Sequence, residues 1–156
     1  MYKHTVEIKF DFWYFKNPLV KGTIVKKQIF VNLPVADLAH SERFYQAIGF
    51  SKVEEFSTDE GVAMAWSDEI WVMLLRHDFY QKFTAGRSIP DAKVTAQVLL
   101  ALSLDSREAV DEMASKAIAN GGTLLPKVII EGAEGMYTED FSDPDGHIWE
   151  LVYMEM

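Results

Sequence analysis

One acidic residue stands in the middle of an apolar stretch close to the end of the chain. Glu150 lies within the run HIWELVYM (147–154), whose composition and period predict a β-strand. In such a strand Glu150 shares one face with Ile148, Val152 and Met154. Burial of an uncompensated carboxylate is expensive, so this acid needs either a hydrogen-bonding partner or a chemical use.

Two interpretations of Glu150 follow from its surroundings. In the functional one, a desolvated carboxylate with a raised pKa acts as a general base, or it anchors a polar group of a ligand. In the structural one, an amide of Gln28, Asn32 or Gln97 donates a hydrogen bond to it, since the predicted strands place these amides on inward faces. Proton abstraction beside a carbonyl also requires a group that stabilises the enolate, and the sequence offers no obvious one.

Other residue types that carry chemistry give weaker signals. The chain has no cysteine, which excludes a disulfide framework, a thiolate metal site and a thiol nucleophile. Its four histidines show no H-x-x-x-H or similar ligand spacing. We find no glycine-rich phosphate loop and no G-x-S-x-G nucleophile motif.

Composition narrows the class of protein further. The chain has 156 residues, 49% of them hydrophobic, and a formal net charge of −9. An acidic chain is a poor partner for nucleic acids or anionic membranes, which basic patches recognise. No apolar run approaches the roughly 20 residues that span a bilayer. There is also no basic start followed by an apolar segment, so we expect a soluble, cytoplasmic protein.

The elements that would position Glu150 occur in the same order twice. The first set is a strand, a helix that begins at an Asp37 cap and stops at Gly49, and three short strands. The ranges of its strands are 28–35, 51–56, 61–66 and 70–76. A linker, 77–95, contains Gly86 and Pro90 and has room for one short helix.

The second set repeats this order after the linker. A helix capped by Asp105 and ended by Asn120-Gly121-Gly122 follows the first strand. Pro126 weakens the next strand, and Asp143-Pro144-Asp145-Gly146 is a turn that contributes geometry rather than chemistry. The predicted strands are 96–104, 123–130, 136–141 and 147–154. The simplest fold is therefore α+β, with two tandem βαβββ modules, 25–76 and 96–156.

Residues 1–24 stand outside the repeat and admit two interpretations. The stretch TVEIKFDF (5–12) alternates apolar and polar residues, so it could add an edge strand, and FWYF (12–15) would then need a hydrophobic surface to cover. Alternatively, the functional domain begins near Val25, and the preceding segment is a start-site artefact.

Three stretches together resemble a known superfamily. The strand ending in VNLPVADL, the helix SERFYQAIGF and the closing DPDGHIWEL are similar to the vicinal oxygen chelate superfamily over roughly residues 25–156. This superfamily includes glyoxalase I, bleomycin-resistance proteins, fosfomycin-resistance enzymes and extradiol dioxygenases. The nearest group is that of the predicted lactoylglutathione lyases. The resemblance implies a curled mixed sheet around a cavity, with the helices outside.

The resemblance also implies where a metal would bind. Superfamily members that use a metal take one ligand, a His, Gln or Glu, from the first and last strand of each module. The corresponding positions here are Phe30, Met73, Leu99 and Glu150. Phenylalanine and leucine have no lone pairs, and a thioether is too soft for the metals that these enzymes use. We therefore favour a chain without a metal or other cofactor over one that binds a divalent metal.

Three functions remain open. The first is a metal-free member that binds a small hydrophobic or aromatic molecule in its cavity. The second is a glyoxalase-like lyase or isomerase that uses Glu150 as catalytic base on a small carbonyl compound. The third is a scaffold whose cavity is packed shut. The expected ligand-binding residues are Gln28, Phe30, Asn32, Trp71, Met73, Gln97, Leu99 and Glu150. The resemblance implies a homodimer, and we expect neither nucleic acid nor membrane as a partner.

Overall fold

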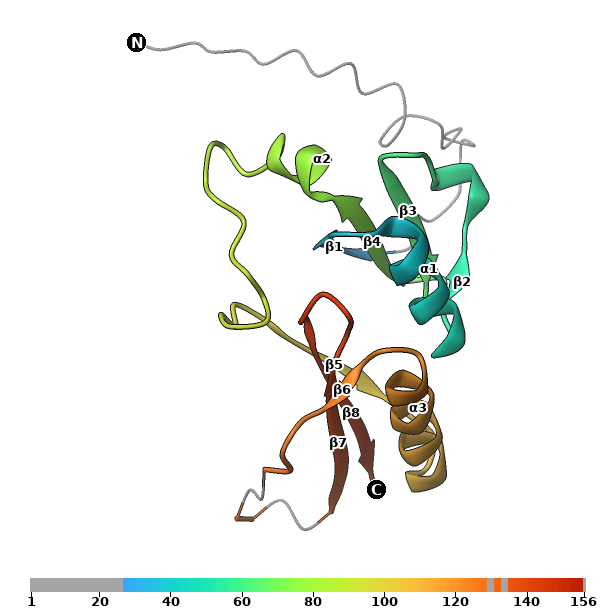
Figure 1. Cartoon of the computed structure of the whole chain (residues 1–156). Coiled ribbons are helices and arrows are strands. Elements are labelled where there is room, and N and C mark those ends of the chain that lie inside the picture. Colours follow the sequence, from blue (N-terminus) through green and yellow to red (C-terminus); the bar gives the residue numbers. More distant parts are fainter. Residues whose placement is uncertain (1–26, 129–130, 133–134, 156) are drawn as a thin grey trace.

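The chain forms two sheets of four strands, each covered on one side by a helix (Figure 1). The computed structural model describes residues 27–128, 131–132 and 135–155, so the predicted extension 1–24 lies outside the described part. The predicted α+β fold with two tandem modules is confirmed. The sheets remain separate and do not close into a barrel. Within the described ranges, no helix is long and apolar enough to cross a membrane.

The first module contains one sheet in the order β1-β4-β3-β2. Strands β1 and β4 pair in parallel, and the other pairs are antiparallel. Its elements are β1 (Ile29–Val35), α1 (Leu38–Ala47), β2 (Ser51–Lys52), the 3₁₀ helix η1 (Glu54–Phe56), β3 (Gly61–Ala65) and β4 (Ile70–Arg76).

The second module repeats this topology in the order β5-β8-β7-β6, again with one parallel pair, β5 and β8. The short helix α2 (His77–Gln81) lies in the linker, where one short helix was expected. The elements of the second module are β5 (Leu99–Ser103), α3 (Arg107–Ala119), β6 (Thr123–Leu124), β7 (Met136–Ser142) and β8 (Ile148–Met154).

The N-terminal caps of the two long helices show how well the local sequence predicted where each helix begins. Asp37 caps α1 as predicted, because its Oδ1 accepts a hydrogen bond from the backbone N–H of His40 at 3.0 Å. Asp105 does not cap α3. Ser106 takes that place, and its hydroxyl accepts from the N–H of Ala109 at 3.1 Å. Neighbouring Asp and Ser are both good caps, so only the three-dimensional path of the chain selects between them.

Two predicted strands are reduced to two residues each, and the predicted strand 96–104 is reduced to Leu99–Ser103. The stretch 51–56 pairs only at β2 and then turns into η1. Strand β6 ends at Leu124, two residues before Pro126, which has no N–H to donate to a ladder. Strands β2 and β6 are each the terminal strand of their sheet. A terminal strand forms hydrogen bonds with only one neighbouring strand, so the sheet does little to extend it against the conformational preference of its own residues.

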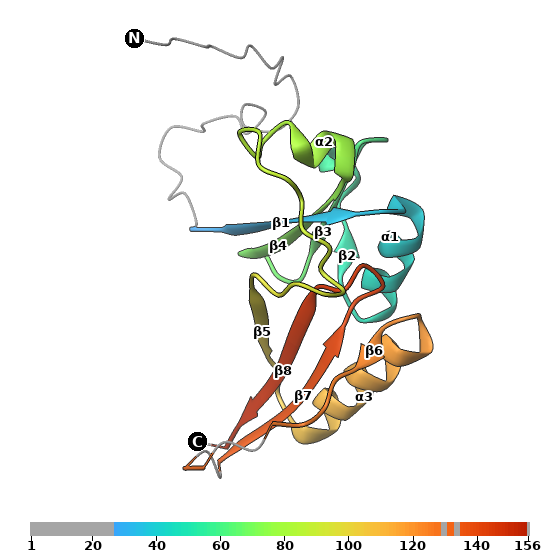
Figure 2. The ribbon, with the colours of Figure 1, turned by 60° about the vertical axis from the view of Figure 1, so that its left-hand side comes forward.

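A single hydrophobic core spans both modules. Helices α1 and α3 lie on the same side of the molecule (Figures 1 and 2). Phe44 of α1 contacts the ring of Phe141 in β7, with centroids 6.0 Å apart. The fully buried residues of this core include Val35, Tyr45, Met64, Leu74, Val110 and Leu151. Because the two helices share this core, neither sheet can rotate freely against the other.

A buried hydrogen-bonded network also joins the modules. The Tyr45 hydroxyl of α1 donates to Oδ2 of Asp143 at 2.8 Å and accepts from Nε1 of Trp149 at 3.1 Å. Asp143 is only 3% exposed, and its Oδ1 accepts from the backbone N–H groups of Asp145 and His147. Every polar group in this network is satisfied, as buried groups must be.

The turn at residues 143–146 therefore does more than change the chain direction. Oδ1 of Asp145 accepts from the N–H of Ala36 at 2.8 Å, and Oδ2 accepts from the hydroxyl of Ser41 at 3.0 Å. A side chain on Gly146 would lie 2.6 Å from the backbone nitrogen of Lys93, so glycine lets the linker pass close by. We had predicted only a geometric role, and the two carboxylates in fact attach the second module to the first.

Ionisation of the network follows from burial. Burial, followed by the nearby Asp143 carboxylate, raises the pKa of Tyr45 well above its ordinary value, so the hydroxyl stays protonated and donates. Burial raises the pKa of Asp143 too, whereas His147 and the Tyr45 hydroxyl oppose that rise. Each hydrogen bond therefore has a fixed donor: Trp149 donates to the Tyr45 hydroxyl, and that hydroxyl donates to Asp143.

Replacement of Tyr45 by phenylalanine tests the network. Y45F leaves the Trp149 N–H without an acceptor and Asp143 without one donor, so we expect a loss of about 2–4 kcal/mol in unfolding free energy. Chemical denaturation measures this loss as a lower midpoint at unchanged slope. The matched control is Y137F, which removes an exposed hydrogen bond to Asp111 and should cost less than about 1 kcal/mol. Equal losses in both variants would contradict the role of the network.

Candidate functional site

The candidate site is the side of each sheet that turns away from its helix, which we call the distal face. In the first sheet, alternate residues such as Leu33 and Leu74 pack toward α1, so their neighbours Phe30, Asn32, Trp71 and Met73 lie on the distal face. In the second sheet, the same reasoning places eleven residues there. They are Leu99, Ala101, Ser103, Met136, Thr138, Asp140, Ser142, Ile148, Glu150, Val152 and Met154.

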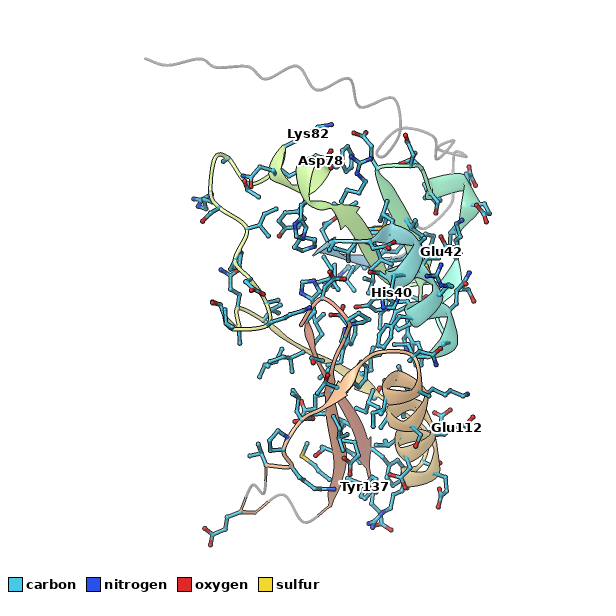
Figure 3. The ribbon with its side chains drawn as sticks, in the orientation of Figure 1. His40, Glu42, Asp78, Lys82, Glu112 and Tyr137 are labelled. Atoms are coloured by element: carbon cyan, nitrogen blue, oxygen red, sulfur yellow. The ribbon has the colours of Figure 1, made fainter. Side chains whose placement is uncertain are left out.

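The distal face of the first sheet is covered by its own chain. Met73 and Ala63 are fully buried there and Leu75 is nearly so. The residues that cover this cluster come mainly from η1 and α2, namely Phe56, Phe79 and Tyr80, together with Val53 and Trp71. Figure 3 shows Asp78 and Lys82 projecting from the outer side of α2. In this half of the molecule the space has become a second hydrophobic core.

The distal face of the second sheet is open in comparison. Leu99 is 66% exposed, Met154 56% and Met136 41%. Side chains on the other side of the same sheet are engaged with α3. The Tyr137 hydroxyl, for example, donates to Asp111 at 2.7 Å, and its ring lies beside α3 in Figure 3. The exposed apolar side chains therefore gather on one face of the sheet.

Glu150 has an acidic neighbour on this face. Asp140 of β7 stands directly opposite Glu150 in the antiparallel pair, and Ala101 of β5 lies on the other side. Oδ1 of Asp140 is buried and has no hydrogen-bonding partner within the described part of the chain. Burial raises the pKa of Asp140, Glu139 raises it further, and Lys127 opposes the rise. The face thus holds two adjacent carboxylates.

Two of the three amides predicted as alternative partners of Glu150 bond elsewhere. Nε2 of Gln28 donates to the carbonyl of Asp68 at 2.7 Å, and Nδ2 of Asn32 lies 3.5 Å from the carbonyl of Phe30. Among the described residues, no side chain donates a hydrogen bond to Glu150. This arrangement favours the interpretation in which Glu150 is available to a ligand.

Asn32 and Gln97 meet in a small crevice between the linker and the start of β8. It also includes Tyr80 and His147 in its lining, and its volume is about 80 Å³. Nε2 of His147 lies 2.9 Å from the carbonyl oxygen of Pro34. Since a carbonyl only accepts, Nε2 carries the proton. Small-molecule pockets usually measure about 300–1,000 Å³, so this crevice suits a few water molecules or one end of a ligand.

The remaining predicted residues are divided between the two sheets. Phe30 and Trp71 pair on the first sheet with ring centroids 5.6 Å apart, and Phe30 is 39% exposed. Met73 is buried under α2, and Leu99 and Glu150 lie on the second distal face. The structure therefore assembles these residues into three local groups.

The four positions that hold metal ligands in the superfamily do not fit a metal here. Phe30 and Leu99 offer no donor atom, and Met73 is enclosed among apolar side chains. Within the described residues, no three His, Asp or Glu side chains converge closely enough to hold an ion. A single carboxylate, Glu150, binds a divalent cation poorly against water.

Sequence analysis missed three residues that matter. Asp140 escaped notice because only the register of β7 against β8 brings it beside Glu150. Tyr45 looked like one apolar member of a helical stripe, and Asp143 looked like an ordinary turn residue. The sequence did contain a signal for Asp143. The turn at residues 143–146 has two aspartates, and a turn does not need two aspartates to reverse the chain.

Comparisons with known proteins agree with this topology. Residues 27–151 match the family described as Glyoxalase/Bleomycin resistance protein/Dioxygenase superfamily. The hypothetical protein SA1046 from S. aureus is similar in structure, with 25% identity, a TM-score of 0.68, and coverage of 83% of this chain and 95% of that chain. No curated protein matches the chain.

Two further solved structures show the same fold. A glyoxalase/bleomycin resistance protein/dioxygenase family enzyme from Burkholderia phytofirmans PsJN has a TM-score of 0.70 at 20% identity, covering 83% of this chain and 100% of its own. The fosfomycin resistance protein FosX from Listeria monocytogenes, in complex with Mn(II) and sulfate, has a TM-score of 0.62 at 19% identity. That likeness covers 85% of this chain and 94% of FosX.

Asp140 generates a prediction about pH. A carboxyl group with a raised pKa stabilises the fold when protonated, and this contribution is lost as the pH rises through the folded-state pKa. D140N should therefore raise the melting temperature at pH 7, and the gain should vanish as the pH approaches the ordinary aspartate value of 3.8. Thermal unfolding between pH 3.5 and 8 measures the effect, with D59N in an exposed turn as the control. A loss of stability in D140N at pH 7 would show that a partner satisfies this carboxylate.

Proposed function

Because the chain belongs to the Glyoxalase/Bleomycin resistance protein/Dioxygenase superfamily, we propose that it binds a small hydrophobic or aromatic molecule without a metal ion. The observation that carries this proposal is the chemistry of the four inherited ligand positions. Three of them hold Phe30, Met73 and Leu99, and two of these, Phe30 and Leu99, remain exposed. Side chains that cannot hold a cation can still contact an apolar ligand.

The surfaces offered to such a ligand have complementary properties. Phe30 and Trp71 present a tilted aromatic pair, with Phe56 edge-on to Trp71 at 5.7 Å. Glu150 and Asp140 supply carboxylates on an otherwise apolar face. Apolar walls with a few polar groups are typical of small-molecule sites, in which the apolar area gives affinity and the polar groups fix orientation.

The proposal includes a homodimer that works in the cytoplasm. Strands β1 and β5 are each the terminal strand of their sheet, so one backbone edge of each is unpaired among the described elements. These edges carry exposed apolar residues, Ile29 at 56% and Leu99 at 66%. Exposed apolar edges favour pairing with another chain, and a second copy would bring the aromatic pair of one chain and the carboxylates of the other to one site.

Ligand binding by the aromatic pair is tested by thermal shift with a panel of small aromatic compounds, on protein treated with a chelator. A ligand at one hundred times its dissociation constant should stabilise the fold by about 2.7 kcal/mol. F30A should abolish most of this gain, whereas V94A, at an 81% exposed position in the linker, should retain it. Stabilisation that appears only after a divalent metal is restored would contradict a metal-free site.

A lyase or isomerase activity is the second candidate, and the carboxylate pair favours it. Two adjacent acids in unlike environments can divide the roles of base and acid, because the pKa of Asp140 is raised by burial. In this mechanism Glu150 removes a proton next to the carbonyl of the substrate, and the protonated form of Asp140 donates a hydrogen bond to the developing oxyanion.

Turnover of small carbonyl compounds tests this second candidate. E150Q keeps the shape of the side chain but removes the base, so we expect at least a hundredfold loss of kcat, which matches the usual contribution of a general base of about 10²–10⁴. Binding measured by thermal shift should survive the substitution. Equal turnover in E150Q and the parent chain would eliminate Glu150 as the base.

A further inference from the structure

Helix α2 covers the first distal face and is itself only partly buried. It has five residues and no side-chain cap at its N-terminus. It contacts the cluster around Met73 through Phe79 and Tyr80, which both remain partly exposed. On its outer side, Nζ of Lys82 lies 2.9 Å from Oε1 of Glu60, and both side chains are more than 40% exposed. Exposed ion pairs contribute little to stability, so two aromatic rings are the main attachment of α2.

The second module shows that the fold does not need such a cover. Its sheet has the same topology, yet Leu99 and Met154 on its distal face are more than half exposed. The first sheet packs its main hydrophobic core on the opposite side, around Leu33, Val35 and Leu74. We therefore expect this sheet to stay folded when α2 moves away.

The chain on both sides of α2 permits the helix to move as a unit. Strand β4 ends at Arg76, directly before the helix, and residues 82–98 after it contain no regular strand or helix. In Figure 1 this linker runs outside both sheets before it enters β5. Ala85 and Gly86 have positive φ angles of 53° and 81°, and alanine is strained in this conformation. A few loop residues of this kind are sufficient to absorb a hinge movement.

The small crevice between the linker and β8 lies directly beside this cover. Tyr80 belongs to the cover of Met73 and also lines the crevice. Residues 95–98 of the linker line the same crevice. Displacement of α2 with the linker therefore joins the crevice to the space over Met73, and the enlarged pocket reaches Trp71, which packs against the same cluster.

The groups that α2 withdraws indicate what can take their place. Its two rings, Phe79 and Tyr80, leave a space with apolar and aromatic walls. These walls are formed by Val53, Phe56, Ala63, Trp71, Met73 and Leu75. The amides of Asn32 and Gln97 lie at the crevice end of the space. A flat aromatic molecule of about two rings that carries one polar group matches these surfaces.

We propose that α2 is a hinged cover that opens to admit a flat aromatic molecule over Met73. The molecule enters through the crevice, replaces the rings of Phe79 and Tyr80, and places its polar group beside Asn32 or Gln97. This inference rests on the proposed binding of an aromatic molecule, and it adds where that molecule lies and which element has to move.

Because the chain has no cysteine, introduced thiols report whether the cover opens. Met73 and its neighbour Leu74 are both fully buried, but Met73 lies under α2 and Leu74 lies in the main core. In the full chain without ligand, M73C should react with a small thiol reagent at least about a hundredfold faster than L74C. Opening of α2 exposes the first thiol, whereas only global unfolding exposes the second. Equal rates would overturn the proposed cover.

A second pair of variants keeps the test decisive if M73C or L74C does not fold. Ala63 pairs with Met73 across β3 and β4, and Val62 pairs with Leu74, which lies in the main core. A63C should therefore react faster than V62C by a similar factor. Equal rates of A63C and V62C would exclude the movement.

The ion pair on the outer side of α2 tests what keeps the cover closed. K82E sets two acidic side chains against each other at Glu60, so the reaction of M73C should become about threefold faster while that of L74C stays the same. K116E breaks a similarly exposed ion pair within α3 and should leave the rate of M73C unchanged. An unchanged rate of M73C in K82E would show that α2 is not the element that opens.

A reversible cross-link tests whether a ligand needs the opening. In K82C/E60C, a reducible bifunctional thiol reagent ties α2 to the turn before β3. Indole, which has two fused rings and one N–H donor, is the probe, and its binding is measured by thermal shift. Binding should weaken at least about tenfold in the cross-linked protein and return on reduction. K116C/E112C, cross-linked within α3, should bind indole as the parent chain does.

Failure of the cover and failure of the proposed function give different results. Indole binding that is equal in the cross-linked and reduced forms would overturn the cover and leave small-molecule binding in place. Rapid reaction of M73C without any binding of indole would overturn the aromatic ligand instead.

Discussion

The hydrogen bond between Tyr45 and Asp143 connects the two halves of the molecule at their buried junction. It links α1 to the turn before β8, and Trp149 completes the network from within β8. The same turn reaches Ala36 and Ser41 through Asp145. A buried polar network with every partner in place has little freedom to rearrange, so the angle between the sheets depends on it. The relative position of the two distal faces therefore depends on the hydrogen bond between Tyr45 and Asp143.

The two modules show how one topology can serve two purposes. In the first, α2 and η1 cover the distal face and convert it into core around Met73. In the second, the corresponding side of β5 and β8 keeps Leu99 and Glu150 accessible. Because the linker that contributes α2 follows only the first module, duplication of the βαβββ unit alone does not produce matching surfaces. The asymmetry comes from the connecting chain.

Membership of the superfamily describes the backbone of this protein but does not identify its ligand. The matched family and the similar solved structures describe its backbone, and FosX was solved with Mn(II). In this chain, the positions at which the superfamily resemblance implies metal ligands carry Phe30, Met73 and Leu99, whose side chains suit apolar contact rather than coordination. Fold therefore constrains where a ligand would bind, whereas side-chain chemistry constrains what the ligand is. Asp140 of β7, which pairs with Glu150 of β8, has no counterpart in the inherited ligand pattern.

Sequence by itself determined the repeated order of elements and the cap at Asp37. These depend on local periodicity, on the chemistry of single side chains and on motif spacing, all of which are present in the linear chain. Tertiary structure alone decided the rest. The pairing of Asp140 with Glu150 depends on strand register, and the network of Tyr45 and Asp143 depends on the packing of one module on the other. The burial of Met73 depends on where the linker folds back. Each of these is a contact between residues distant in sequence, and no local pattern encodes such contacts.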